Sequence, residues 1–200
     1  QRGSWSLDME SEGPESIGKR LSEKGISFLP LSDLPKEEFE GCVIISNEKV
    51  HADKPFVRLI PKNLYVGIGC KRGTAEALIE DAFQKALFQA RAYEYQVASL
   101  ASVDAKADEK GLLDFALHHH LPIHFYKAEE LRKVTEDFGL PISKFVENTI
   151  GVGNVCQSAA LMESMKGKTL LPKTKFASAT VAIALGLSGS SALDRVTRRK

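Results

Sequence analysis

The sequence predicts an α/β protein, namely a three-layer α/β/α sandwich with a mixed or largely parallel sheet, preceded by the end of a smaller α/β region. From residue 62 onward, short apolar segments typical of strands alternate with longer segments whose apolar residues recur every three or four positions. Strands that alternate with helices along a chain usually form a sheet covered by helices on both faces.

The first 61 residues are predicted to be a flexible start followed by a small strand-containing region. Residues 1–16 are rich in Ser, Glu and Gly without periodicity, which predicts a loop. A helix and two strands are then expected at 17–24, 26–31 and 42–46. Residues 47–63 contain several prolines and predict a connection. The chain begins with Gln1 rather than Met, so we expect it to be part of a longer protein.

Residues 62–200 are predicted to form the second domain. Strands are expected at 64–68, 96–102, 122–126, 169–172 and 180–186, and helices at 75–90, 111–120, 128–138 and 155–165. Thr74 and Asp108 stand where helix N-caps would be. Because strand C-termini usually build ligand sites, we expect the turns at 67–74, 102–108 and 151–154 to meet at one edge of the sheet.

The composition excludes several classes of protein. A net charge of +1 argues against a dedicated nucleic-acid binder, which would carry a basic excess. The three cysteines, Cys42, Cys70 and Cys156, are widely spaced and predict neither a disulfide framework nor a zinc site. No apolar run is long enough to span a membrane, so a cytoplasmic protein is expected.

The strongest local signal is GIGCKRGT at 67–74, between a predicted strand and a predicted helix. Its glycines allow close backbone approach, and the helix start with Lys71 and Arg72 favours an anion. The alternative is a tight turn with solvated cations. The segment is neither a P-loop nor GxGxxG, because no GK[ST] ends it and Gly73 falls one position late. A nucleotide-binding enzyme would need saturable nucleotide binding at this segment for support.

Cys70 lies within this turn, where a helix start and two cations should lower the pKa of its thiol and make it a nucleophile. A small buried residue is the alternative, since no histidine base lies nearby in the sequence. The histidines at 118–120 and 124 could suggest a metal site. Three consecutive helical residues point in different directions, so we expect no metal bound by the protein.

Four segments occur in a fixed order: GIGCKRGT at 67–74, ASVDAKADEKGL at 101–112, GVGNVCQSAAL at 151–161 and LLPKTKFASATVAIA at 170–184. They resemble the motifs of the C-terminal domain of the CbiG/CobE cobalamin-biosynthesis family. The resemblance implies that residues 62–200 are this domain and that residues 1–61 contain the end of the family's central region.

The resemblance also implies an anionic corrinoid ligand, whose carboxylates need separated cations or helix starts around an apolar floor. The cations expected there are Lys71, Arg72, Lys106, Lys173 and Lys175, although the last two could be solvated edge lysines. The substrate-binding residues implied are Gly67, Gly69, Cys70, Lys71, Arg72, Gly73, Thr74, Ser102, Asp104, Lys106, Gly151, Gly153, Asn154, Gln157 and Lys173. At Gln157 related proteins usually carry Glu, which weakens the case for a catalytic carboxylate there.

The activity implied by the resemblance is hydrolysis of the δ-lactone of cobalt-precorrin 5A with release of acetaldehyde, giving cobalt-precorrin 5B. The base is not identified; the candidates are Asp104, Glu109 and Cys70, and Glu109 could instead be a first-turn acid of its helix. No cofactor is expected, because the substrate carries its own cobalt; the expected partners are the cobalt-corrinoid and neighbouring pathway enzymes. The alternative is a non-catalytic corrinoid-binding or handover module of the CobE type.

Overall fold

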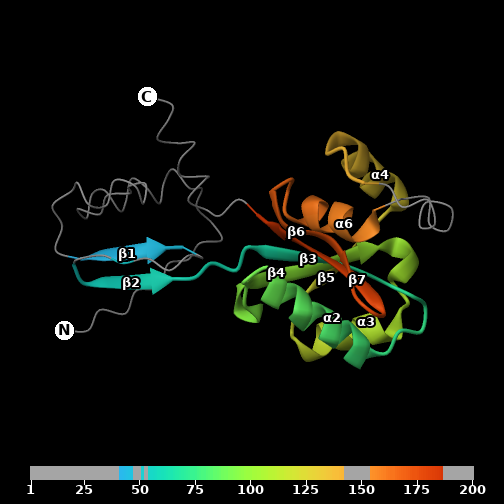
Figure 1. Ribbon diagram of the computed structural model, residues 1–200, viewed down its shortest axis with the longest axis horizontal. Helices are drawn as coiled ribbons and strands as arrows, with labels where there is room; N and C mark the ends of the chain where they lie inside the picture. Colours follow the sequence, from blue (N-terminus) through green and yellow to red (C-terminus); the bar gives the residue numbers. More distant parts are fainter. Residues whose placement is uncertain (1–40, 47–50, 52–53, 142–153, 187–200) are drawn as a thin grey trace, which may run out of the picture. The chain divides into compact units, whose positions relative to one another are not determined.

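The computed structural model describes residues 41–46, 51, 54–141 and 154–186 (Figure 1). Residues Pro61–Leu187 form one compact unit, and the first two strands belong to a separate unit. None of the helices within these described ranges is long and apolar enough to cross a membrane.

The separate unit contains two parallel strands, β1 Cys42–Ile45 and β2 Phe56–Leu59. β1 agrees with the predicted strand at 42–46. The prediction of a connection throughout 47–63 was wrong at β2, because Pro55 precedes the strand and its carbonyl accepts a hydrogen bond from the amide of Cys42. The helix expected at 17–24 and the strand at 26–31 lie outside the described residues.

A five-stranded mixed sheet forms the centre of the larger unit. Its strands are β3 Leu64–Cys70, β4 Val97–Val103, β5 Ile123–Tyr126, β6 Lys168–Lys175 and β7 Ala179–Leu185. The order across the sheet is β5-β4-β3-β7-β6. β3, β4 and β5 are parallel, whereas β7 is antiparallel to both β3 and β6. β6 is longer than the strand predicted at 169–172 and includes Lys173 and Lys175.

Helices cover both faces of this sheet, which confirms the predicted three-layer α/β/α sandwich (Figure 1). The helices described are α2 Glu76–Gln89, α3 Lys110–His118, α4 Ala128–Asp137 and α6 Val155–Glu163, with short 3-10 helices η2 Glu94–Gln96 and η3 Asp104–Lys106. α2 and α3 pack together on one face, and α6 packs on β3, β4 and β7 from the other face with α4 beside it.

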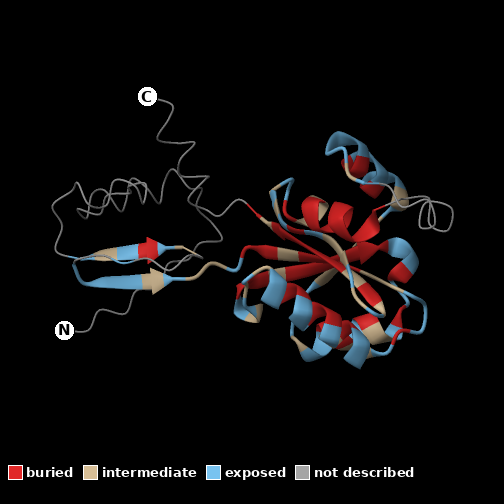
Figure 2. Ribbon diagram, in the orientation of Figure 1, coloured by how far each residue is buried: buried red, intermediate tan, exposed pale blue. Residues whose placement is uncertain are grey.

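The two faces of the sheet carry side chains of different sizes. On β3, Val66 and Ile68 pack with Phe83 of α2 and Phe115 of α3 in the main core, which is buried in Figure 2. On the opposite face, small residues leave room for α6, as at Gly67 of β3 and at Ala182 and Ala184 of β7. This alternation is the period of two expected of a strand buried on both sides.

Two predicted helix caps were wrong by one position. α2 begins at Glu76 with Ala75 as its N-cap, and the Thr74 hydroxyl instead donates to the carbonyl oxygen of Lys71 at 2.7 Å. α3 begins at Lys110, and neither helix has a side-chain cap hydrogen bond. The side chains of Asp108 and Glu109 therefore remain available for contacts across the sheet edge.

Candidate functional site

The polar turns gather at one edge of the sheet, which we call the carboxyl edge. Because β3, β4 and β5 are parallel, their ends at Cys70, Val103 and Tyr126 lie at the same edge, as the sequence predicted for the turns at 67–74 and 102–108. α6 also begins near this edge, since Val155 packs against Val103. Gly151 and Gly153 lie outside the described residues, so their predicted role is not addressed by the structure.

The most deeply buried charges at the carboxyl edge are Glu109 and Lys106. The side chain of Glu109 is 4% exposed and that of Lys106 is 10% exposed. The backbone amide of Gly73 donates to Glu109 Oε1 at 2.6 Å, and Lys106 Nζ lies 3.5 Å from Glu109 Oε2. Among the described residues, Oε2 has no hydrogen-bond partner within bonding distance. We call Cys70, Gly73, Lys106 and Glu109 the Glu109 cluster.

Arg72 lies beside this cluster but is engaged with Asp108. Arg72 Nη1 donates to both carboxylate oxygens of Asp108, at 3.0 and 2.9 Å, and Nη2 donates to the carbonyl of Ala105 at 3.1 Å. The hydrogen bond from Arg72 holds the pKa of the Asp108 carboxyl below its usual value, although both side chains are well exposed. Arg72 thus joins the β3–α2 turn to Ala105 of η3 and to Asp108, which follows η3.

Cys70 is half-buried at the end of β3, and the expected lowering of its thiol pKa was wrong. Burial raises the pKa of this thiol, the nearby Lys106 ammonium opposes the rise, and the Glu109 carboxylate adds to it. A helix start and two cations next to it in the sequence do not lower the pKa, because Arg72 is paired with Asp108 and burial disfavours the thiolate. Cys70 is therefore a poor nucleophile in this structure.

A second polar group lies at the start of α6. Asn154 is fully buried and its Nδ2 donates to Oε1 of Gln157 at 3.3 Å. The same Gln157 oxygen accepts a hydrogen bond from the Lys173 backbone amide at 3.2 Å, which ties α6 to β6. Asn154 Oδ1 makes no hydrogen bond within the described part of the chain. The glutamine thus supplies hydrogen bonds and no charge at this position.

Three other predicted site residues, Gly69, Ser102 and Asp104, have structural partners. The Ser102 hydroxyl is buried and donates to the carbonyl of Ile68 at 2.7 Å, and the Gly69 carbonyl accepts from Thr180 Oγ1 at 3.1 Å. Asp104 is exposed and its Oδ1 accepts the amide hydrogen of Ala105 at 2.8 Å. Ser102 and Gly69 therefore hold β3 in place, and Asp104 lacks the burial that the Glu109 carboxylate has.

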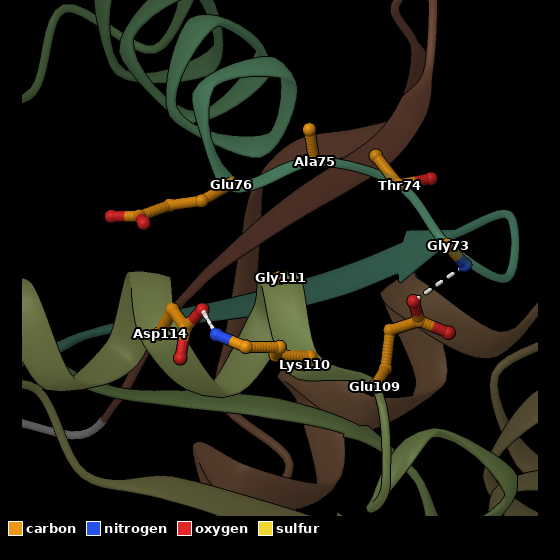
Figure 3. Close-up of a pocket in the computed structure, with 8 residues that line it drawn as sticks. All are labelled: Gly73, Thr74, Ala75, Glu76, Glu109, Lys110, Gly111 and Asp114. Carbon is orange, nitrogen blue, oxygen red and sulfur yellow. Dashed lines mark hydrogen bonds and ion pairs between the residues drawn. The ribbon is translucent and has the colours of Figure 1, made fainter.

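A pocket of about 310 Å³ opens at the carboxyl edge between the first turns of α2 and α3 (Figure 3). Its lining residues are Gly73, Thr74, Ala75, Glu76, Glu109, Lys110, Gly111 and Asp114. Gly111 is required for this geometry, because a Cβ there would meet the carbonyl oxygen of Thr74. Sequence reasoning missed five of these lining residues, although the glycine at the start of a predicted helix was a visible signal: Ala75, Glu76, Lys110, Gly111 and Asp114.

The charges of this pocket differ from the anion cradle expected from GIGCKRGT. Three carboxylates line it, those of Glu76, Glu109 and Asp114, against the single ammonium of Lys110. Lys110 is itself paired with Asp114, and Glu76 contacts His118 Nδ1 at 2.5 Å. A neutral group suits such a pocket better than a ligand carboxylate, because like charges repel at short range.

Three of the four histidines considered for metal binding, His118, His119 and His124, have carboxylate partners. His119 lies between Glu94, at 2.6 Å from Nδ1, and Glu80, beside Nε2. Partial burial acts to lower the pKa of His119, but these two carboxylates outweigh it and the pKa is raised. His124 Nδ1 lies 2.7 Å from Glu163. No cluster of His, Cys, Asp and Glu suited to a metal occurs among the residues that the structure describes.

Comparisons with known proteins converge on one pathway. A family model described as Cobalamin synthesis G C-terminus matches residues 64–184. The cobalt-precorrin-5A hydrolase of Salmonella typhimurium is 32% identical over 149 residues, which cover 72% of this chain and 42% of that protein. The probable cobalt-precorrin-5A hydrolase of Methanocaldococcus jannaschii is 30% identical over 182 residues, covering 84% of this chain and 55% of that protein.

A solved structure extends the likeness to three dimensions. The crystal structure of CobE, a protein from the cobalamin biosynthetic pathway, matches with a TM-score of 0.59 and 29% identity, over 64% of this chain and 93% of CobE. This chain therefore spans about half the length of the two hydrolases, while its match extends over nearly all of CobE.

Proposed function

Since the chain belongs to the family described as Cobalamin synthesis G C-terminus, we propose that it acts in cobalamin biosynthesis on cobalt-precorrin 5A. The reaction is hydrolytic opening of the δ-lactone, with release of acetaldehyde to give cobalt-precorrin 5B. Two relatives named cobalt-precorrin-5A hydrolase, at 32% and 30% identity, support this assignment. The observation in the structure that carries it is the buried Glu109 carboxylate, which lines a pocket at the carboxyl edge.

The chemistry of this reaction matches what the carboxyl edge offers. Opening an ester with water requires a group that takes a proton from the water and donors that stabilise the developing oxyanion. The first turns of α2 and α3 supply backbone amides beside the pocket, and the Glu109 cluster supplies buried charge. In this proposal the chain needs no cofactor of its own, because the cobalt arrives with the substrate.

The partner in this proposal is the cobalt-corrinoid, with neighbouring pathway enzymes as the source and destination of the intermediate. The pocket volume of about 310 Å³ suits one peripheral group of a corrinoid and not the whole macrocycle. The rest of the ring would then lie along the carboxyl edge. The three free cysteines agree with a reducing compartment, so we place the protein in the cytoplasm.

The decisive experiment supplies cobalt-precorrin 5A to the purified chain and measures acetaldehyde together with the mass of the corrinoid product. We expect acetaldehyde to form in proportion to the enzyme present, with loss of the lactone. Saturable binding without either product would contradict the hydrolase assignment for this chain and would favour the alternative of a non-catalytic corrinoid-binding module. A chain that neither binds nor converts the substrate would contradict both.

The exposed cations of the β3–α2 turn give a prediction about binding. Replacing both Lys71 and Arg72 with alanine should weaken corrinoid binding about tenfold or more, because the ligand's outer carboxylates lose charge-assisted hydrogen bonds. Unfolding stability should hardly change, since both side chains are exposed and solvent screens the Arg72–Asp108 pair. Titration of a corrinoid with free carboxylates by visible absorbance at two ionic strengths, with a thermal melt, measures both effects.

The matched control removes two cations elsewhere on the same unit. Lys85 is exposed in the last turns of α2 and Arg91 is exposed just after that helix. The Lys85→Ala/Arg91→Ala variant should bind the corrinoid with wild-type affinity and wild-type salt dependence. Equal affinity in the Lys71→Ala/Arg72→Ala variant would show that this turn makes no contact with the ligand.

A further inference from the structure

Glu109 is the carboxylate at the carboxyl edge whose surroundings differ most from those of a structural ion pair. Its side chain is 4% exposed, yet among described residues it has one hydrogen bond, from the Gly73 amide to Oε1 at 2.6 Å. Oε2 has none, and Lys106 Nζ at 3.5 Å is too far for a normal hydrogen bond. A carboxylate accepts about four hydrogen bonds, so most of the accepting capacity of Glu109 is unused.

Burial of an incompletely bonded carboxylate is costly, and the structure keeps it next to a cation. Removing a charge from water costs several kcal/mol, and a carboxylate without a counter-ion would bind a proton instead. Lys106 is itself buried, in the short helix η3, three residues before Glu109. The ammonium therefore lies close enough to compensate the charge of the Glu109 carboxylate, while Oε2 keeps its capacity to accept a hydrogen bond from a ligand or a water molecule.

The pocket beside Glu109 determines which part of the substrate can approach it. The carboxylates of Glu76 and Asp114 share the lining with Glu109, and its single ammonium, Lys110, is already paired with Asp114. The lining therefore offers a propionate or acetate of the corrinoid no cation that is not already paired with a carboxylate, whereas a neutral ester needs none. Backbone amides of the first turns of α2 and α3 lie along the same pocket and can donate to an ester oxygen.

We propose that the pocket between the starts of α2 and α3 binds the neutral cyclic ester of the substrate, and that Glu109 accepts the proton of the water that attacks it. This inference rests on the proposed lactone hydrolysis. It assigns Lys106 a positioning role, because Lys106 acts through Glu109. Asp104 is exposed and bonded to its own turn, and burial raises the pKa of the Cys70 thiol, so neither other candidate fits the role as well.

The step balances without any further reactant. The water oxygen forms a bond to the acyl carbon while one of its protons passes to Glu109, and the carbonyl becomes an oxyanion. The oxyanion then reforms the carbonyl as the bond from the acyl carbon to the ring oxygen breaks. The ring oxygen leaves with the electron pair and takes the proton from Glu109. The products of this step are a carboxylic acid and an alcohol, and Glu109 returns to its charged form. Acetaldehyde leaves in a later step, in which the bond between the alcohol carbon and the ring carbon breaks, the hydroxyl gives up its proton and the ring carbon takes up a proton.

The test compares Glu109→Gln with wild type on cobalt-precorrin 5A, by the mass of the ring-opened corrinoid and by acetaldehyde release. We expect kcat to fall about 100-fold or more while KM stays within about threefold, as for removal of a general base. Glu129→Gln, an exposed site on α4 with the same loss of charge, should retain the wild-type rate.

Chemical rescue separates a proton acceptor from a residue that only holds the fold. Glu109→Ala leaves space for a small acid, so formate should restore part of its rate and should not affect wild type. Thermal melts accompany each variant. Glu109→Asp keeps the charge and serves as the test if Glu109→Gln and Glu109→Ala fail to fold. We expect this variant to fold and to have a lower kcat with an unchanged KM. A wild-type rate in any folded Glu109 variant overturns the inference.

The outcome for wild type distinguishes this inference from the proposed function. If wild type opens the lactone and Glu109→Gln does so equally fast, the role of Glu109 is wrong and the function stands. If wild type forms neither ring-opened product nor acetaldehyde, the proposed function fails and this inference fails with it. A covalent acyl adduct at Cys70, detected by mass spectrometry during turnover, would also overturn the role assigned to Glu109.

Discussion

The Gly67→Ala variant should be severely destabilised, with a loss of about 3 kcal/mol or more in the free energy of unfolding. A Cβ at Gly67 would lie 1.7 Å from the carbonyl oxygen of Cys156 and 2.9 Å from the amide nitrogen of Ala160. Both atoms belong to the backbone of α6, which cannot rotate away as a side chain could. Either α6 moves off the sheet or the variant does not fold.

Gly69→Ala is the matched control, because it makes the same substitution two residues further along β3. There the added Cβ would meet Thr180 Oγ1 at 2.7 Å, the end of a short side chain that can rotate. We expect a smaller loss, about 1 kcal/mol, measured by urea unfolding followed by circular dichroism. Equal stabilities for the two variants would show that α6 does not need the close approach at Gly67.

The periodicity of the sequence was sufficient to predict the layers and the carboxyl edge. Leu64–Cys70 and Val97–Val103 are apolar runs followed by polar turns, and parallel strands of this kind end at the same edge. The small residues that make room for α6 can be seen in the sequence, but the sequence does not show that a helix packs against them. Gly67 falls in both the predicted strand 64–68 and the motif GIGCKRGT, where it was assigned to ligand binding, whereas in the structure it lies within β3 beneath α6.

The chemistry of the edge could not be predicted in the same way, because it depends on contacts distant in the sequence. From the sequence, Arg72 was interpreted as a cation available to a ligand, because its partner in the structure, Asp108, is 36 residues away. Cys70 reads as an activated thiol, but burial decides the direction of its pKa shift. Glu109 reads as a first-turn acid, and only packing shows that it is buried against Gly73 and Lys106.

A second carboxylate, the partly buried Glu163, should matter for stability and not for catalysis. It lies at the end of α6, far along the helix from the carboxyl edge, and its side chain is 7% exposed. Three side chains converge on it: Ser99 Oγ at 2.5 Å and His124 Nδ1 at 2.7 Å on Oε1, and Tyr126 hydroxyl at 2.5 Å on Oε2. Unlike Glu109, this carboxylate accepts hydrogen bonds from three side chains, as expected of a residue that stabilises the fold.

We expect Glu163→Ala to lose about 2 to 4 kcal/mol of unfolding free energy, because three polar groups lose their shared acceptor and a void is left. Burial acts to raise the pKa of the Glu163 carboxyl, but the hydrogen bonds from Ser99, Tyr126 and His124 outweigh it, so the pKa lies below its usual 4.5. A lowered folded-state pKa means that the stabilisation is present above pH 4.5 and is lost as the pH falls through the folded-state value.

Urea unfolding of wild type and Glu163→Gln between pH 3 and pH 7 therefore tests both the sign and the size of the contribution that Glu163 makes to the pH dependence of stability. Wild-type stability should fall below about pH 4.5 more steeply than that of Glu163→Gln, which has no proton to bind at this position. Glu136→Gln removes an exposed carboxylate from α4 and should follow the wild-type curve. Parallel curves for wild type and Glu163→Gln would mean that the Glu163 carboxylate binds a proton equally well in the folded and unfolded chain. Its hydrogen bonds would then favour neither ionisation state, and the anchoring of α6 to β4 and β5 would depend on packing alone.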